Sequence, residues 1–423
     1  MNINEIKTKL LSGGFDKDLA MLYGDTQKAR GRYSKALESF SELYQETENI
    51  RLFSAPGRTE VGGNHTDHQH GSVLAASVDM DVIAVAAPNG ENVIRIKSEG
   101  YDMDVIDISE LEIDADEKGR ASALIRGVAS RFAEIGCTLA GFNAYTTSNV
   151  LKGSGLSSSA AFEVLVGTII NGMFFGNRAD SVTVAKIGQY AEREYFGKPC
   201  GLLDQMASSL GGFTYADFND PENPITEKIN LDINSFGYTL CVVDTGGNHA
   251  DLTQDYADIT IECRNISHAL GVNFLRDAKP EEFYGSIAKL REQCGDRAVL
   301  RAFHFFNEQQ RVLDQKAALK NGDFEEFLKL VNESGRSSYD YLQNLYSNSN
   351  VNEQGLSLAI ALTKRFLNGR GACRVHGGGF AGTIQCYIPT EKLGDYKTMI
   401  EAVFGAGTCS VLHIRPVGGY EII

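Results

Sequence analysis

A glycine- and serine-rich loop, LKGSGLSSS, joins a β-type segment to an apolar helical segment in the middle of the chain. The pattern predicts a strand over GFNAYTTSNV (141–150) and a helix that opens at LSSSAAFEVLVG (156–167). Gly153 and Gly155 permit positive φ angles and let a ligand approach the backbone. The unpaired NH groups at a helix start favour an anion, so the loop predicts a phosphate site. An ordinary N-capped helix is the alternative, because Gly-Ser runs before helices are common. The loop is not a Walker A motif, since no Gly-Lys-Ser/Thr closes it.

Strand-like and helical segments occur along the rest of the chain, which predicts an α+β fold. Helices are expected over residues 2–50, on the outside of the body, and over the long stretch 281–346. The chain has 423 residues. One hydrophobic core stops growing at about 250–300 residues, so we expect two domains. The change in pattern places an N-terminal domain at 1–213 and a C-terminal domain at 214–423.

The composition excludes several classes of protein. With 43% hydrophobic and 22% charged residues, the chain has the balance of a folded protein. Its net charge of −15 argues against a nucleic-acid partner. Eight cysteines without a CxxC pair predict free thiols in the cytoplasm, and no secretory signal or membrane span is recognisable. We expect a cytoplasmic enzyme without a membrane partner; the oligomeric state stays open, with a monomer as the default.

Four segments together resemble galactokinase, a member of a superfamily that also contains homoserine, mevalonate and phosphomevalonate kinases. They are APGRTEVGGNHTDHQHG (55–71), LKGSGLSSSAAF (151–162), EREYFGKPCGLLDQMASSLGG (192–212) and CRVHGGGFAGTIQ (373–385). The resemblance runs from about residue 45 to the C-terminus. It implies two domains with the active site in the cleft between them. It also implies an ATP- and Mg²⁺-dependent kinase that phosphorylates the anomeric hydroxyl of galactose or a close relative.

The resemblance also assigns roles to individual residues. Asp204 would accept the proton of the anomeric hydroxyl or orient it, and Arg58 would lie beside that carboxylate and the transferred phosphoryl group. Glu192, with Ser158 or Ser159, would hold Mg²⁺. The residues implied for ATP are Gly153, Ser154, Gly155, Leu156, Ser157, Ser158 and Ser159. These roles suit phosphoryl transfer, which depends on positioning and on neutralising the phosphate oxygens.

The segment GGNHTDHQHG (62–71) concentrates three histidines and an aspartate, which raises the alternative of a metal site. On an extended segment, however, His68 and His70 share a face that His65 and Asp67 do not join. No CxxC or HExxH spacing supports a metal either. The resemblance instead makes His65 and Asp67 sugar contacts, with Tyr256 near the sugar. We expect His68 and His70 to be bystanders.

Asn64 departs from the family pattern, because galactokinases usually have GEHTDYN where this chain has GNHTDHQ. The family's glutamate faces the 6-hydroxyl of the sugar, so Asn64 is a predicted substrate contact. A neutral amide would not repel a carboxylate at that carbon, and galacturonate is therefore an alternative acceptor. Glu60 also departs from the pattern, since it stands where the family commonly has Asn. A non-catalytic sugar sensor is a further alternative, disfavoured by the intact loop serines and Asp204.

Overall fold

The computed structural model describes residues 1–45, 48–150, 155–198, 200–247 and 252–423, and it has the α+β architecture that the sequence predicts. Its larger sheet has the strand order β12-β1-β2-β5-β3-β4, with β6 paired to β2 and β7 to β6. All pairings are antiparallel except β3 with β5. Its strands are β1 (Arg51–Gly62), β2 (Ser72–Pro88), β3 (Val93–Ser98), β4 (Met103–Asp107), β5 (Phe142–Ser148), β6 (Phe213–Asp217), β7 (Ile225–Ile229) and β12 (Tyr420–Glu421).

The smaller sheet has the order β11-β8-β10-β9 and belongs to the C-terminal part of the chain. Its strands are β8 (Tyr238–Asp244), β9 (Ala372–His376), β10 (Thr383–Pro389) and β11 (Cys409–Leu412). The closing segment of the chain forms β11 and β12, which belong to different sheets. The domain boundary placed at 213/214 falls inside β6, which pairs with β2. The larger sheet therefore continues past residue 213 to Ile229 at the end of β7. The C-terminal strand β12 also belongs to this sheet.

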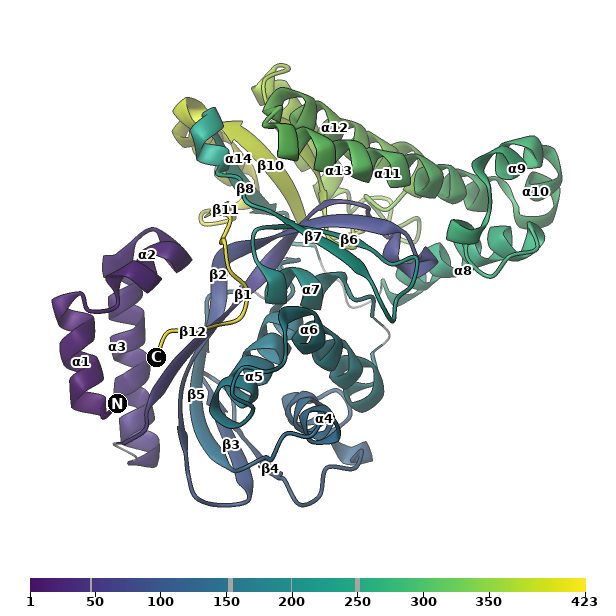
Figure 1. The fold of residues 1–423 in the computed structure, drawn as a ribbon. Coiled ribbons are helices and arrows are strands. Elements are labelled where there is room, and N and C mark those ends of the chain that lie inside the picture. Colours follow the sequence, from purple (N-terminus) through teal and green to yellow (C-terminus); the bar gives the residue numbers. More distant parts are fainter. Residues whose placement is uncertain (46–47, 151–154, 199, 248–251) are drawn as a thin grey trace.

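Helices cover both faces of the larger sheet (Figure 1). One layer comes from the N-terminus and packs through α3 on β2 and β5, while the other packs through α5 on β1 and β2. The first layer contains α1 (Ile3–Ser12), α2 (Asp16–Tyr23) and α3 (Thr26–Tyr44). The second contains α4 (Ala121–Glu134), α5 (Ser158–Phe174), α6 (Ser181–Tyr190) and α7 (Leu203–Leu210).

The long helical stretch predicted over 281–346 is divided into several helices, because glycines with positive φ stand at its breaks. Gly295 separates α10 from α11, and Gly322 separates α11 from α12. α12 packs on β9 of the smaller sheet, whereas α9 and α10 lie at the end of α11 that is distant from this sheet (Figure 1). The C-terminal helices are α8 (Thr253–Ala269), α9 (Pro280–Gly285), α10 (Ile287–Cys294), α11 (Asp296–Asn321), α12 (Phe324–Ser337), α13 (Gly355–Leu367) and α14 (Leu393–Phe404).

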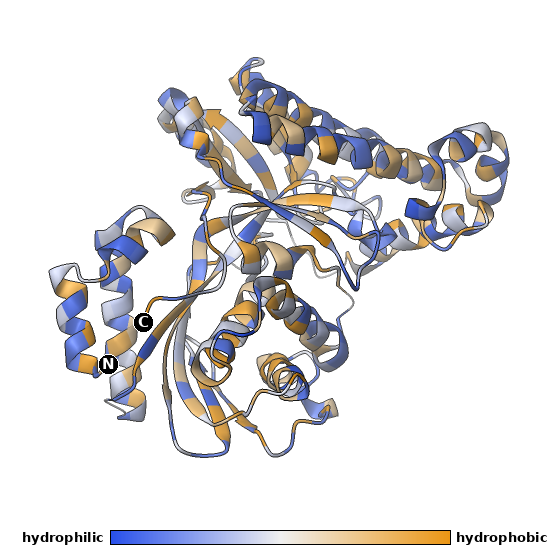
Figure 2. Ribbon diagram, in the orientation of Figure 1, coloured by the Kyte–Doolittle hydropathy of each residue, from blue (hydrophilic) through white to orange (hydrophobic). Residues whose placement is uncertain are grey.

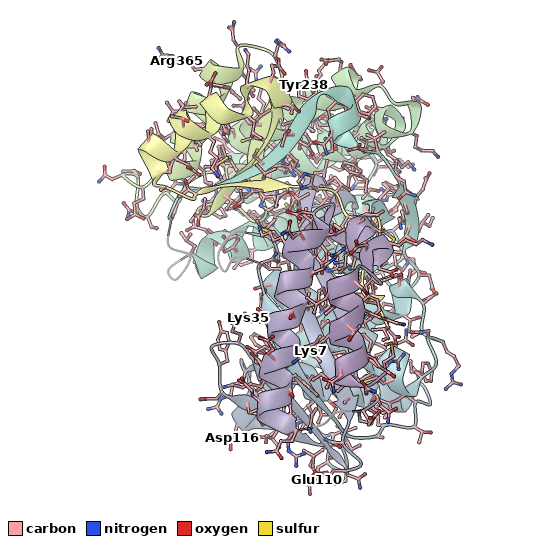
Figure 3. All side chains as sticks on the ribbon, turned by 90° about the vertical axis from the view of Figure 1, so that its left-hand side faces the viewer. Lys7, Lys35, Glu110, Asp116, Tyr238 and Arg365 are labelled. Atoms are coloured by element: carbon pink, nitrogen blue, oxygen red, sulfur yellow. The ribbon has the colours of Figure 1, made fainter. Side chains whose placement is uncertain are left out.

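The N-terminal helices form an amphipathic layer, with hydrophilic and hydrophobic residues alternating along them (Figure 2). Lys7 and Lys35 lie on the side of this layer that faces the viewer in Figure 3. Beneath it, the fully buried Asp81 carboxylate accepts hydrogen bonds from Arg32 of α3 and from Arg415 near the C-terminus. The attraction between the two guanidinium groups and the carboxylate offsets the free-energy cost of removing these charges from water. The cluster therefore ties α3, β2 and the C-terminal segment together.

All eight cysteines lie in the described segments and are free thiols. Among the helices that the structure describes, none is long and apolar enough to cross a membrane.

Candidate active site

Asp204 and Arg58 form the charged centre of the site. Asp204 stands in the first turn of α7 and Arg58 on β1, and Arg58 Nε donates to Asp204 Oδ1 at 2.6 Å. The Ser157 hydroxyl donates to Asp204 Oδ2, also at 2.6 Å. Burial alone would raise the pKa of the Asp204 carboxyl, but the charge and hydrogen bond of Arg58, together with Ser157, hold that pKa below its ordinary value. Asp204 is therefore an ionised carboxylate at neutral pH.

The glycine–serine loop is anchored to β1 where it enters α5. The Leu156 carbonyl accepts from the Arg58 backbone NH at 3.0 Å, and the Gly155 carbonyl accepts from the Arg58 guanidinium. Gly57 permits this approach, because a Cβ there would lie 2.8 Å from the Leu156 oxygen. Gly155 and Ser157 both have positive φ angles, +70° and +58°. Two further residues predicted to bind ATP, Gly153 and Ser154, lie outside the described residues.

A second polar group lies beside the loop, around Glu192. The Ser159 hydroxyl donates to Glu192 Oε1 at 3.2 Å, and Lys198 Nζ pairs with the same oxygen at 2.9 Å. Gln205 Nε2 donates to both Glu192 and Glu163, at 2.8 and 2.9 Å. Glu163 Oε1 is buried and has no hydrogen-bond partner among the residues that the structure describes. Hydroxyl and carboxylate oxygens, one of them unpartnered, form a donor set that suits a hard cation such as Mg²⁺.

A cavity of about 170 Å³ opens next to Asp204. It brings together predicted site residues from distant parts of the sequence and adds others that were not predicted. The lining residues are Arg58, Glu60, His65, Asp67, His68, Cys200, Gly201, Leu203, Asp204 and Gly378. The cavity is therefore lined by hydrogen-bonding groups on several sides, and the Arg58–Asp204 pair forms part of its wall.

The histidine segment is not extended, contrary to the geometry assumed for its side chains. Positive φ at Gly63 and His65 turns the chain, and Asp67–Gln69 forms a 3₁₀ turn. His65, Asp67 and His68 consequently all line the cavity, so His68 lies closer to the predicted sugar contacts than was expected. His70 instead stacks on Phe274 with ring centroids 3.6 Å apart. Among the described residues, no group of three or more His, Cys, Asp or Glu is placed to hold a metal ion.

His65 is held as a neutral ring. Its Nε2 lies 2.9 Å from the Gly378 carbonyl oxygen, so that nitrogen carries the proton. Burial, reinforced by the neighbouring His68, lowers the pKa of His65 to about 3. The ring therefore hydrogen bonds without charge at any pH near neutrality.

Asn64 and Tyr256, both predicted sugar contacts, lie behind the cavity wall. The Asn64 side chain is buried; its Nδ2 donates to Glu60 and to the Gly377 carbonyl, while its Oδ1 accepts from Asn344. Tyr256 donates to the Gly379 carbonyl at 2.8 Å, and a Cβ on Gly378 would meet its ring. Neither residue is among those that line the cavity. The structure places both as supports of the glycine turn at 377–379.

Glu60 lines the cavity, but the sequence analysis noted it only as a departure from the family pattern and gave it no role in the site. A usable signal was present, because Glu60 stands two residues after Arg58 on a strand and alternate residues share a face. His68, Gly201 and Gly378 offered no such signal, since turns position His68 and Gly378 and an irregular loop positions Gly201.

The comparisons with known proteins agree with this geometry. Residues 123–212 match the model of the GHMP kinase N-terminal domain, and residues 38–88 match the galactokinase galactose-binding signature. The structure superimposes on the crystal structure of Lactococcus lactis galactokinase complexed with galactose with a TM-score of 0.76. That alignment has 23% identity and covers 90% of this chain and 98% of the other. A mevalonate kinase crystal structure gives a TM-score of 0.61 at 14% identity, over 86% of this chain and 98% of the other.

These findings first define a class, the GHMP small-molecule kinases, whose fold and N-terminal domain this chain shares. Within that class, a galactokinase from Glaesserella parasuis is 30% identical over 82% of this chain and 87% of its own length. A galactokinase from Lactobacillus helveticus is 29% identical over 87% of this chain and 94% of its own length. The chain belongs to the galactokinase family.

Proposed function

We propose that this protein transfers the γ-phosphoryl group of ATP to the anomeric hydroxyl of galactose. The observation that carries the proposal is the Arg58–Asp204 pair, which lies between the start of α5 and the cavity. Family membership and the galactose-binding signature over residues 38–88 support galactose as the acceptor. The chemistry requires an acceptor hydroxyl and a triphosphate to meet at this pair.

Asp204 would accept a hydrogen bond from the anomeric hydroxyl and take its proton as the bond to phosphorus forms. Its lowered pKa keeps it ionised, as a base must be. Arg58, fixed by Asp204 and the Gly155 carbonyl, would place positive charge beside the transferred group. The loop that enters α5 would hold the phosphates through backbone NH groups. His65 and Asp67 would bind the sugar from the far side of the cavity.

Ser158, Ser159 and Glu192 are the residues we propose for Mg²⁺, and Glu163 Oε1, which has no partner within the described part of the chain, lies nearby. When bound with ATP, the ion supplies positive charge to the phosphate oxygens. We also propose that the enzyme works in the cytoplasm, consistent with its eight free thiols.

Galacturonate is disfavoured as the acceptor by two features of the cavity. Glu60, Asp67 and Asp204 all line it, so a sugar carboxylate would meet like charges. Among the cavity's described lining residues, Arg58 is the one permanently charged cation, and Asp204 holds it. Asn64, on which the galacturonate hypothesis depended, does not line the cavity.

The proposal is tested by measuring ATP consumption with Mg²⁺ against galactose, galacturonate, glucuronate, N-acetylgalactosamine and arabinose. We expect galactose to give the highest kcat/KM and the two uronic acids to give the lowest. A higher kcat/KM for galacturonate than for galactose would contradict both the proposal and the charge argument.

Gly201 offers a test of the sugar-binding wall. A Cβ at this position would overlap the Asp67 carboxylate, so Gly201→Ala must displace Asp67 from its place in the cavity. Displacing a positioning group by about 1 Å can cost 10²-fold, and we expect the kcat/KM for galactose to fall by about 10- to 100-fold. Steady-state kinetics would show this mainly as a raised galactose KM with an unchanged ATP KM. Gly285→Ala, whose Cβ would meet nothing within 4 Å, is the matched control. Equal kinetics for the two variants would contradict the assignment of Asp67.

A further inference from the structure

Glu60 faces the same cavity as Arg58 and is built into it from the same strand. The pairing of β1 with β2 is regular from Arg58 to Glu60, opposite Ser77 to Ala75. Alternate residues on a regular strand point to one face, about 6.6 Å apart. Both side chains line the cavity although Arg58 is only 7% and Glu60 only 5% exposed. A sugar that presents one hydroxyl to Asp204 and Arg58 thus extends toward the Glu60 carboxylate.

The Glu60 carboxylate is held by one of its two oxygens. Arg374 Nη2 donates to Oε1 at 2.9 Å, and Asn64 Nδ2 donates to the same oxygen at 2.7 Å. Within the described segments, these are the hydrogen bonds that the carboxylate accepts, and both end on Oε1. Since Glu60 lines the cavity, Oε2 is the oxygen left for a group inside it.

The two residues that hold Glu60 are themselves fixed. Arg374 is fully buried on β9 and donates to the backbone carbonyls of Val61 and Val375, at 2.6 and 3.0 Å. Asn64 also donates to the Gly377 carbonyl at 2.9 Å. A carboxylate whose partners have no freedom to move is a preorganised acceptor, which loses little entropy when it binds a hydroxyl.

We propose that Glu60 is a specificity-determining residue that accepts a hydrogen bond from a non-reacting hydroxyl of the sugar. It thereby selects neutral sugars and rejects acidic ones. The inference rests on the proposed sugar-kinase function and adds to it the residue that reads the sugar away from the anomeric carbon. The contact between Asn64 and Glu60 also explains why both positions depart together from the usual family pattern. The carboxylate now stands at residue 60, and the amide at residue 64 supports it.

The charges around Glu60 favour this role over that of a simple partner for Arg374. Arg374 and Arg58 stabilise the ionised form, while Asp67 across the cavity opposes it. Burial nevertheless raises the pKa of Glu60 to about 7, so the carboxylate is not fully stabilised by its protein partners. A hydrogen bond donated by a sugar hydroxyl would further stabilise the ionised form of Glu60.

The test compares the wild-type enzyme with Glu60→Gln, using galactose and its 2-, 3-, 4- and 6-deoxy analogues. A hydrogen bond to a charged acceptor contributes enough that its loss lowers kcat/KM about 10- to 100-fold. We expect Glu60→Gln to show that loss for galactose, mainly through KM. We also expect one deoxy analogue to be poor for the wild type yet no worse than galactose for Glu60→Gln. This pairing identifies the hydroxyl that Glu60 binds.

Two further variants make the result decisive. Glu117→Gln is the matched control, because Glu117 is a partly buried carboxylate paired with Arg126 and outside the cavity; it should keep the wild-type pattern across the analogues. Glu60→Asp keeps the charge beside Arg374 but withdraws it from the cavity, and it should reproduce the altered pattern if Glu60→Gln fails to fold. An unchanged analogue pattern in the folded Glu60 variants, with wild-type turnover of galactose intact, would overturn the inference alone. Absence of galactose turnover by the wild type would overturn the proposed function and the inference with it.

Discussion

Replacing Asp204 by Asn is expected to lower kcat about 10³-fold while the KM values for galactose and ATP change only a few-fold. The amide keeps the shape of the side chain and can still accept from Arg58, but it cannot take the proton of the anomeric hydroxyl. General base catalysis typically contributes 10²- to 10⁴-fold, which sets the scale of the loss. Steady-state kinetics on the purified variant, with thermal denaturation to verify folding, would measure it.

The control for this variant is Asp395→Asn, an exposed aspartate in the first turn of α14. It should retain wild-type kcat. An Asp204→Asn enzyme that is folded and retains kcat within about threefold of wild type would contradict the assignment of Asp204 as the base.

Replacing Arg58 by Lys is expected to lower kcat by about 10²- to 10³-fold and to change its pH dependence. A lysine is a point charge and cannot serve both Asp204 and the Gly155 carbonyl as the guanidinium does. Burial raises the pKa of Asp204, and Arg58 is the main group that brings it back below its ordinary value. Weakening that pair must therefore raise the pKa of Asp204. Since the ionised carboxylate is the active form, kcat falls as pH falls through this pKa, and the acidic limb moves to higher pH.

The measurement is the pH profile of kcat for the wild type, Arg58→Lys and the control Arg291→Lys, whose side chain is 68% exposed. Arg291→Lys should give the wild-type profile. An acidic limb at the same pH for wild type and Arg58→Lys would show that Arg58 does not set the protonation of Asp204.

Local sequence patterns predicted most of the elements because their signals are local. The helix predicted to open within 156–167 forms α5, which begins at Ser158. Glycines interrupted the long helical stretch at points that periodicity alone does not mark, since the apolar pattern continues on either side. The pairing of β6 with β2 is non-local, which is why a boundary drawn from the change in sequence pattern falls inside β6.

The sequence predicted site residues well where they lie on a regular strand or helix, because the element fixes the direction of each side chain. It predicted them poorly where a turn sets that direction. Arg58 stands on a regular strand and Asp204 on a helix, and the structure brings them together as the resemblance implies. Asn64 lies between two residues with positive φ, Gly63 and His65, so strand alternation does not apply to it. Its side chain turns toward Glu60 and Asn344, and Glu60 occupies the cavity in its place. The direction of the Asn64 side chain thus depends in part on Asn344 and Gly377, which are 280 and 313 residues away in the sequence.

The most direct test of the account is to identify the product formed from galactose and ATP with Mg²⁺. We expect ³¹P and ¹³C NMR to show phosphate on the anomeric carbon, formed by the wild type and, at equal enzyme concentration, not detectably by Asp204→Asn within the same time. Phosphate on another carbon, or ATP consumption without a phosphorylated sugar, would contradict the claim that this cavity presents the anomeric hydroxyl of galactose to the Arg58–Asp204 pair.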